Sequence, residues 1–514
     1  MRRESGPGPA PGTDLLDRLS HAFLTRTAPG QALAGLVDQM RRRRVPRGWT
    51  GLLGAAAVAC VVVLVVTGVA LTFFYTPSRE LVTYDGAHGP LRGAEVSLAF
   101  DSTMAISTQV RGGLLLRQAH HWAALLLPAI LLLQLLVMFF TGGFRRPRQG
   151  SWVLLFLLLV VVLLGGWTGY ALPDDLLSGT GLRVVHGILL GIPVVGSWLS
   201  MVVFGGEFPG TVIEHFYPVH VLVVPVLVAL LMVARLRSSW VHGPPQPARP
   251  GADERHVVGM PMIPEAAGRA TGMFAVVTGM LLLFGSSVTI SPVWAYGPSS
   301  PGEVSAGSQP DWYTGFLDGA LRLVPRGWEV EWLDRTWTLA VVVPLAAVGL
   351  FLGLVMLYPY LEAALTGDRR EHHVLERPRH APVRTGLGVA GMTFYGVLWA
   401  AASSDILATH FHLGVEGVVT TLQIALVLGP VTAFALTRLI CHGLQRRDRE
   451  VARHGHETGR IVQLPEGRFV EVRTPVAAGE RWRLLPPGRA EPDGPPEDED
   501  PRGEDSRSVA TLAR

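Results

Sequence analysis

Long apolar stretches separated by short polar segments dominate the pattern of this chain. A helix that spans a bilayer needs about 20 predominantly apolar residues, and eight stretches are long enough. They lie near residues 50–75, 113–141, 151–173, 211–236, 270–290, 336–360, 385–403 and 417–441. The pattern therefore predicts an all-α, polytopic membrane protein with eight transmembrane helices.

Arginine clusters at the ends of these stretches predict the orientation. They lie at 41–44, 145–148, 235–237, 369–370 and 446–447, before the first span and after the second, fourth, sixth and eighth. Because cytoplasmic loops carry an excess of Lys and Arg, we expect a cell-membrane protein with both termini in the cytoplasm. The outward-facing segments would then be 76–112, 174–210, 291–335 and 404–416.

The same pattern divides the chain into six regions. These are a cytoplasmic tail at 1–49, a helical bundle at 50–240, a cytoplasmic linker at 241–269, a four-helix membrane domain at 270–444, a small cytoplasmic cap at 445–485 and a tail at 486–514. The last region is rich in Pro, acidic residues and Arg, so we expect it to be disordered. The outer loop of the second membrane domain is long enough to indicate a functional role.

Composition narrows the chemistry. Hydrophobic residues make up 49% of the chain, and the net charge of +3 gives no indication of a nucleic-acid partner. Only two cysteines occur, and no C-x-x-C-H motif is present. These counts exclude an iron–sulfur cluster held by four cysteines and covalent attachment of haem.

Two histidines inside apolar stretches are the leading candidate ligands. His120 lies in the second span and His220 in the fourth. An ionisable residue within a membrane segment is costly and usually functional, and two on separate helices could supply both axial ligands of a haem. The alternative is a pair of merely hydrogen-bonded histidines. His121 competes with His120, but it points about 100° away around the helix, so we interpret it as a supporting or packing residue.

Longer motifs around these histidines resemble one family. They are GLLLRQAHHWAA, TGGFRRPR, TGYALPDDLLSGTGLR, FGGEFPG, FYPVH, SAGSQPDWY and ERPRHAPVRT. In this order they are similar to cytochrome b of the actinobacterial menaquinol–cytochrome c reductase, a cytochrome bc complex. The resemblance covers roughly residues 45–480.

The resemblance implies a four-helix bundle that holds haem b. In the family the second and fourth helices each give one histidine to an outer and one to an inner haem. By this comparison His120 and His220 are the outer ligands, and Arg117 is the partner of an outer propionate. Gly68 and Gly169 match positions where a missing side chain lets the macrocycle pack closely.

The inner positions depart from the family's pattern. Where the family has its inner histidines, this chain has Gln134 and Arg235. Val137 replaces the family's propionate-binding arginine, Leu155 replaces an inner glycine, and only Gly54 is kept. Gln is a poor iron ligand and Arg stays protonated, while Leu155 would fill part of the space that a missing haem leaves. We therefore expect one b haem per chain.

The outer loop carries Pro-Asp-Trp-Tyr at 310–313, which resembles the family's quinol-oxidation motif with Asp in place of Glu. The resemblance implies that Asp311 accepts a quinol proton and that Tyr313 assists by hydrogen bonding. The alternative is a solvated turn, since this is good turn chemistry. The nearby Pro-Asp-Asp at 173–175 is equally suited to capping a helix.

The family implies further partners. They are a Rieske iron–sulfur subunit, a cytochrome c subunit, a terminal oxidase, menaquinone or menaquinol and membrane lipid, in a dimeric complex. In that reaction quinol gives one electron to the iron–sulfur partner and one to the outer haem. Two alternatives stay open from the sequence. One is a redox-inactive or regulatory membrane paralogue, and the other is a single-haem quinol dehydrogenase with a different acceptor.

Overall fold

The structure is a computed structural model that describes residues 27–304, 309, 311–325 and 327–484. Residues 1–26 of the N-terminal tail, Pro310 of the outer motif and the tail at 486–514 lie outside the described residues.

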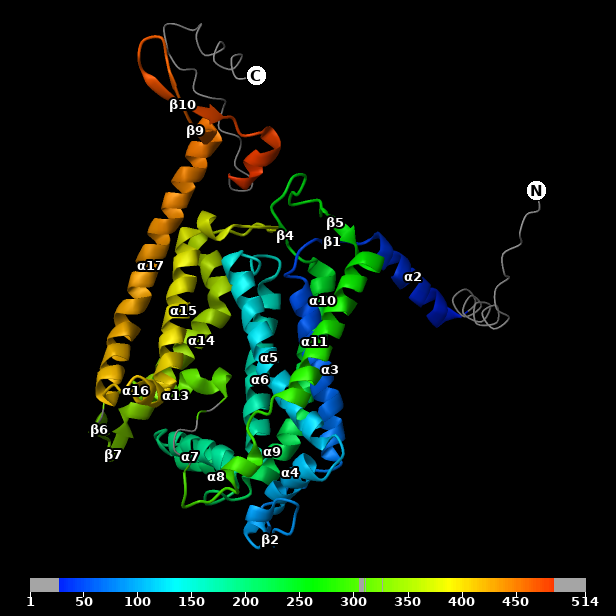
Figure 1. Cartoon of the computed structure of the whole chain (residues 1–514), viewed down its shortest axis with the longest axis vertical. Coiled ribbons are helices and arrows are strands. Elements are labelled where there is room, and N and C mark those ends of the chain that lie inside the picture. Colours follow the sequence, from blue (N-terminus) through cyan, green and yellow to red (C-terminus); the bar gives the residue numbers. More distant parts are fainter. Residues whose placement is uncertain (1–26, 305–308, 310, 326, 485–514) are drawn as a thin grey trace, which may run out of the picture.

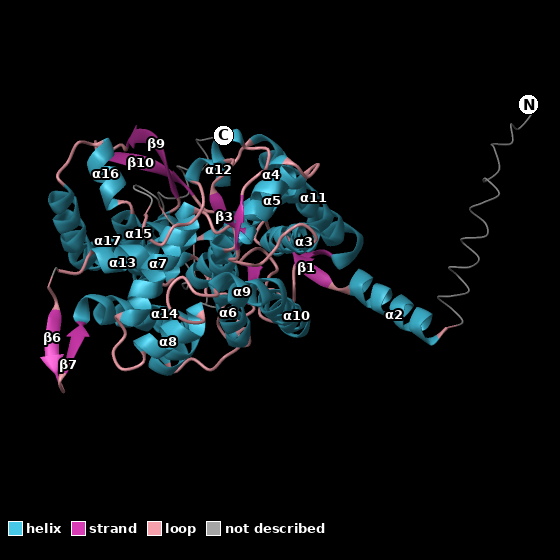
Figure 2. Cartoon of the chain, turned by 90° about the horizontal axis from the view of Figure 1, so that it is seen from below, coloured by secondary structure: helices cyan, strands magenta, loops and turns pink. Residues whose placement is uncertain are grey.

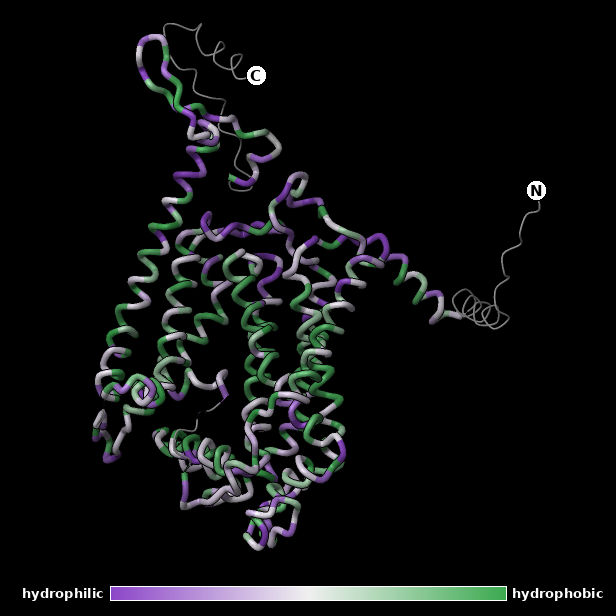
Figure 3. Tube along the Cα trace, viewed as in Figure 1, coloured by the Kyte–Doolittle hydropathy of each residue, from purple (hydrophilic) through white to green (hydrophobic). Residues whose placement is uncertain are grey.

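Eight helices in the described part of the chain are long and apolar enough to cross a membrane, as predicted (Figure 1). They are α3 (Leu52–Thr72), α5 (Gly113–Phe140), α6 (Gln149–Ala171), the run α9–η2–α10 (Val212–His242), the run η3–α11 (Met262–Ser287), α14 (Leu339–Thr366), α15 (Pro382–Ala402) and α17 (Val415–His454). Hydrophobic residues fill the middle of the bundle and polar residues mark its two ends (Figure 3). This division fits a lipid environment, in which helices satisfy their own backbone hydrogen bonds.

The first five spans form one packed unit. Helix α5 lies at its centre and packs against α3, α6 and α11, while α10 packs on α6. The core between them combines small and aliphatic side chains with aromatic ones such as Trp152, and Cys60, Ala119 and Leu155 are fully buried there. Small residues let helix backbones approach closely within a membrane. In a second cluster, α15 packs against α17 and against the short α13 (Gly315–Arg322).

Short helices gather at one end of the bundle, where the predicted outward loops lie (Figure 1). They are α4 (Leu98–Thr108), α7 (Leu176–Leu190), α8 (Gly196–Phe204), α12 (Val293–Tyr296), η4 (Trp312–Thr314) and α16 (Ser404–His410). Helix α7 begins with a capping box, because the Asp175 carboxylate accepts from the Ser178 N–H at 2.9 Å and the Ser178 hydroxyl accepts from the Asp175 N–H. Asp175 therefore acts as a helix cap.

The opposite end carries the arginine clusters and most of the small strand pairs. Helix α2 (Ala28–Arg42) projects away from the bundle (Figure 2). The two-stranded pairs are β1 (Arg44–Pro46) with β5 (Gly259–Pro261), β2 (Leu81–Thr83) with β3 (Glu95–Ser97), β4 (Gln246–Pro247) with β8 (Val374–Leu375), β6 (Glu329–Trp332) with β7 (Arg335–Thr338), and β9 (His456–Gln463) with β10 (Phe469–Thr474). The β9–β10 hairpin follows α17, which runs 40 residues and ends well beyond the predicted span.

The fourth span is not a uniform α-helix. Residues Val219–Val223 form the π-helical turn η2 between α9 (Val212–Pro218) and α10 (Val224–His242). A π turn accommodates one additional residue and often occurs at a functional site. His220 lies within this turn.

Candidate functional site

The imidazole rings of His120 and His220 face each other inside the first bundle. His120 lies on α5 and His220 on η2, and their ring centroids are 6.1 Å apart with an interplanar angle of 62°. Metal–imidazole bonds of about 2 Å on each side would separate two ring centres by roughly this distance.

Helix α3 orients the His120 ring. The Thr67 hydroxyl donates its single proton to the carbonyl of Val63 at 2.6 Å and lies 2.9 Å from His120 Nδ1. Because that proton is already used, the contact requires His120 to donate through Nδ1–H. Nε2 is then the unprotonated nitrogen that can bind a metal.

Helix α6 orients the His220 ring in the same way. His220 Nδ1 lies 3.0 Å from the carbonyl oxygen of Gly165 and 3.2 Å from the Thr168 hydroxyl. A carbonyl oxygen only accepts, so Nδ1 carries the proton and Nε2 is again free. A ligating histidine typically donates its other N–H to such an acceptor, which fixes its tautomer and orientation.

A glycine follows the threonine on each of these helices and makes room for the facing ring. A Cβ atom at Gly169 would lie 2.4 Å from Cε1 of His220, and one at Gly68 would lie 3.1 Å from Cε1 of His120. Both positions were expected to accommodate a macrocycle. In this structure they accommodate the rings of His120 and His220 themselves.

Arg117 lies one turn before His120 on α5. Its Nη2 donates to the carbonyl of Ser291 at 2.6 Å, whereas its Nη1 is buried and makes no hydrogen bond within the described part of the chain. An unpaired guanidinium nitrogen in a buried position fits an anionic group such as a propionate. The two free Nε2 atoms, the glycines and this nitrogen together fit a haem with two histidine ligands.

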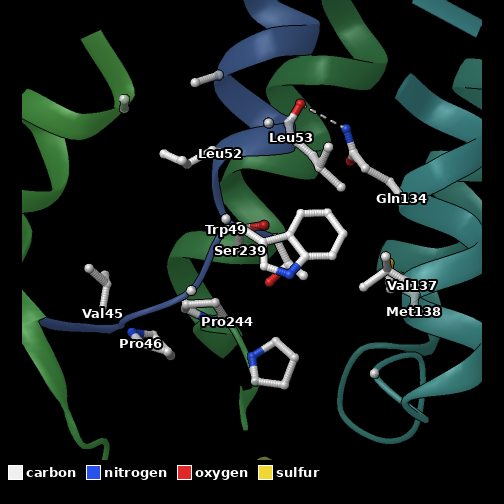
Figure 4. Close-up of a pocket in the computed structure, with 18 of the residues that line it drawn as sticks. Val45, Pro46, Trp49, Leu52, Leu53, Gln134, Val137, Met138, Ser239 and Pro244 are labelled. Atoms are coloured by element: carbon white, nitrogen blue, oxygen red, sulfur yellow. Dashed lines mark hydrogen bonds between the residues drawn. The ribbon is translucent and has the colours of Figure 1, made fainter. Parts of the chain in front are cut away.

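Most of the residues that depart from or match the family's inner-haem pattern lie around a large pocket toward the other end of the bundle. Gln134 is 5% exposed, and its Nε2 donates to the carbonyl of Leu53 at 3.1 Å (Figure 4). Gln134 and Arg235 both line the pocket, which has a volume of about 1240 Å³, as do Val137 and Gly54. Leu155 is fully buried in the core and is not part of the lining.

Asp311 and Tyr313 are brought together with His121. The Tyr313 hydroxyl donates to Asp311 Oδ2 at 2.8 Å, and His121 Nε2 lies 3.5 Å from Asp311 Oδ1. Burial, followed by the Asp311 charge and the hydrogen bond, raises the pKa of Tyr313 well above its usual range, so the phenol stays protonated as a donor. The arrangement is a carboxylate held between a hydroxyl and an imidazole, which can accept and pass on a proton.

The neighbouring Asp174 is buried beside Arg79, whose Nη1 lies 3.2 Å from Asp174 Oδ1. Burial raises the pKa of Asp174 to about 6, although the Arg79 charge offsets part of the effect. Sequence reasoning assigned no separate role to this residue.

Two further features of the site were missed. The supporting threonines were not identified, although the dipeptide Thr-Gly occurs at both 67–68 and 168–169 and was the available signal. The contact of His121 with Asp311 joins residues that are 190 positions apart, and no local pattern could have indicated it.

Comparisons with known proteins agree with the motifs. A family model described as Cytochrome b(N-terminal)/b6/petB matches residues 125–298. The cytochrome bc1 complex cytochrome b subunit of Streptomyces coelicolor is 44% identical over 437 residues, which cover 85% of this chain and 80% of that protein. The corresponding subunit of Mycobacterium leprae is 42% identical over 90% of this chain and 83% of that protein, and that of Corynebacterium efficiens is 40% identical over 86% and 82%.

Among solved structures, a chain of a hyperthermophilic respiratory Complex III aligns with a TM-score of 0.59 at 18% identity, covering 84% of this chain and all of that one. At this identity the match shows a shared fold. The subunit relatives are much closer, and they confirm the resemblance expected from the motifs. The chain is an integral membrane protein that belongs to the family of cytochrome b subunits of actinobacterial cytochrome bc1 complexes.

Proposed function

We propose that this chain is the cytochrome b subunit of a quinol–cytochrome c reductase that oxidises menaquinol at the outer face and carries a single b haem. Its partners would be a Rieske subunit and a cytochrome c subunit in a dimeric complex that can associate with a terminal oxidase. Both termini would face the cytoplasm. Relatives with 40–44% identity are named as subunits of the bc1 complex, which supports this assignment.

The observation that carries the proposal is the pair of facing imidazoles. Both have Nδ1 engaged by the neighbouring helix, so both Nε2 nitrogens are available. His120 and His220 would supply the axial ligands, Gly68 and Gly169 the room and Arg117 a partner for a propionate. When bound, haem b supplies a one-electron acceptor and donor.

The residues of the outer loop would handle protons. Quinol oxidation releases two protons together with two electrons. Asp311 would accept one of these protons. Its carboxylate is only 14% exposed, and its two oxygens can both act as acceptors. Tyr313 holds one oxygen by donating to it, and His121 lies next to the other. His121 would therefore orient Asp311 and provide a next acceptor.

The single haem is tested by stoichiometry. We expect a pyridine haemochrome assay on the purified complex to give one b haem per chain, with a low-spin, bis-histidine spectrum. Two haems per chain, or an iron between Gln134 and Arg235, would contradict the proposal.

Substitutions test the ligands. His120→Ala and His220→Ala should each abolish the low-spin spectrum, because one imidazole cannot fill both axial positions. His121→Ala should leave that spectrum in place and is the matched control. An unchanged spectrum in either of the first two variants would show that other residues bind the iron.

Kinetics test the proton acceptor. Asp311→Asn keeps the shape but removes the base, so haem reduction by menaquinol in the presence of the Rieske partner should slow by about a hundredfold or more. Quinone binding should survive, and Tyr313→Phe should have a smaller effect because it removes only one donor.

The wild-type protein tests the alternative functions. If it reduces no haem with any quinol, that result favours a regulatory paralogue. Haem reduction without electron delivery to cytochrome c would favour a single-haem dehydrogenase with another acceptor.

A further inference from the structure

The pocket around Gln134 and Arg235 is larger than a typical small-molecule site. Its volume of about 1240 Å³ exceeds the roughly 300–1,000 Å³ of most such sites. It is lined by α3, α5, α6, α10 and α11 and by the chain before α3. Figure 4 shows Leu53 and Trp49 on the side of the pocket that faces Val137 and Met138, while Leu52 points the other way. Most of this lining is apolar.

All the charged residues that line the pocket within the described chain are arginines, and no Asp or Glu is among them. Arg148 is fully engaged with backbone carbonyls and His373. Arg47 pairs with Glu265, and Arg269 is exposed. Arg235 differs from these, because its Nε is shielded from solvent and has no hydrogen-bond partner in the described part of the chain.

A guanidinium whose Nε is buried without a partner beside an apolar cavity favours an anionic occupant. Burying a charge without a partner is strongly unfavourable. Ser238 and Ser239 follow at the third and fourth positions after Arg235, so they share its helix face, and both also line the pocket. The site thus combines one cation and two hydroxyls with long apolar walls.

We infer that this pocket binds an anionic membrane phospholipid, with the phosphate on Arg235 and the two serines and the acyl chains along the walls of α3 and α5. A neutral quinone can accept a hydrogen bond from the guanidinium but supplies no counter-charge. The inference goes beyond the proposed function but rests on its single-haem stoichiometry, since a second macrocycle would compete for the same space.

Lipid retention tests the phosphate contact. The intact complex is purified in mild detergent, exchanged into nanodiscs of phosphatidylcholine with or without phosphatidylglycerol, and re-extracted, and the lipid that remains bound is counted by native mass spectrometry. Wild type should retain anionic lipid. Arg235→Gln should weaken retention by about tenfold or more, the scale of a lost charge-assisted hydrogen bond. Arg235→Lys should recover part of it.

Two matched controls accompany this variant. Arg237→Gln removes the same charge from an exposed residue that is on the same helix but does not line the pocket. Its lipid retention should equal that of wild type. Inorganic phosphate added during re-extraction should not replace the lipid, because it cannot fill the apolar walls. If free phosphate displaces the retained lipid, a small-anion site replaces the lipid site.

A pocket-filling variant tests the acyl-chain contact independently. A Cβ at Gly54 would meet no atom within 4 Å, so Gly54→Phe should fold and occupy the pocket. It should reduce lipid retention without changing the haem content. Gly349→Phe on α14 also enters open space but lies outside the lining, so it should change neither.

The outcomes separate this inference from the proposed function. Two haems per chain would overturn both. One haem per chain with equal lipid retention in wild type, Arg235→Gln and Gly54→Phe would overturn the lipid site alone. Recovery of bound quinone instead of phospholipid from the wild-type protein would also overturn it.

Discussion

Replacing Gly169 with alanine should displace the His220 ring and cost haem binding. The added Cβ would lie 2.4 Å from Cε1 and 3.0 Å from both ring nitrogens, whereas ordinary contacts are about 3.5–4.0 Å. The ring would have to move by roughly 1 Å, and its bonds to Gly165 and Thr168 at 3.0 and 3.2 Å would lengthen or break. Overpacking costs about 1–3 kcal/mol and a lost hydrogen bond about 0.5–1.5 kcal/mol.

The expected loss is therefore about 2–4 kcal/mol in haem affinity. The direction of the change in stability is informative. Alanine is the better helix former by about 1 kcal/mol, so it would stabilise α6 if the His220 ring were not in the way. Haem content, the low-spin spectrum and the thermal midpoint of the holoprotein measure the effect.

Two other glycines provide a graded series. Gly68→Ala should have a weaker effect, since its Cβ would lie 3.1 Å from His120, and Gly54→Ala should have none on this haem, since nothing lies within 4 Å. Equal effects at the three positions, or a Gly169→Ala protein with full haem content and an unchanged spectrum, would refute the geometry on which the site rests.

Three further predictions follow from the contacts. His121→Ala should keep the haem spectrum but slow quinol oxidation by about tenfold, the scale of one interaction with a charged group; an unchanged rate would remove His121 from the proton route. The folded-state pKa of Asp174 is raised to about 6, so its stabilising contribution is full below about pH 4 and is lost as the pH rises through 6. The thermal midpoint of wild type relative to Asp174→Asn should therefore fall over this range, by the equivalent of about 2–3 kcal/mol, and a pH-independent difference would contradict the assignment. The Arg384 guanidinium lies 2.9 Å from carboxylate oxygens of both Glu362 and Glu376. Arg384→Met should therefore lower the free energy of unfolding by about 3–5 kcal/mol. A melting temperature equal to that of wild type would show that this ion-pair network is not needed for stability.

The spans could be predicted from the sequence because membrane helices must be both long and apolar. Their ends were less predictable. The 40 residues of α17 include a polar C-terminal segment beyond Leu444, and helix formation there depends on contacts such as Arg379 with Asp448 at 2.7 Å rather than on hydropathy. Periodicity carries no information about such partners.

The candidate ligands could also be identified from the sequence, but the way they are held could not. A histidine in an apolar segment is conspicuous, whereas Thr67 and Thr168 resemble any small polar residue in a membrane helix. Their role depends on which helix lies opposite. The pocket beside Gln134 could not be predicted from the sequence either. Gln134 and Arg235 at the family's inner-histidine positions, together with Leu155 at its inner-glycine position, suggested a partly filled space.

The π turn at Val219–Val223 determines where the fourth span can gain or lose one residue without changing which face of α10 lines the pocket. Gln134 follows His120 by fourteen positions, whereas Arg235 follows His220 by fifteen, yet both line the same pocket. Because the turn absorbs one residue, the two helices keep equivalent faces despite unequal counts. A one-residue deletion inside the turn would thus leave the downstream face of α10 in phase, while the same deletion after it would rotate that face by about 100°. An alignment that ignores the turn would pair the wrong residues in every helix position beyond it.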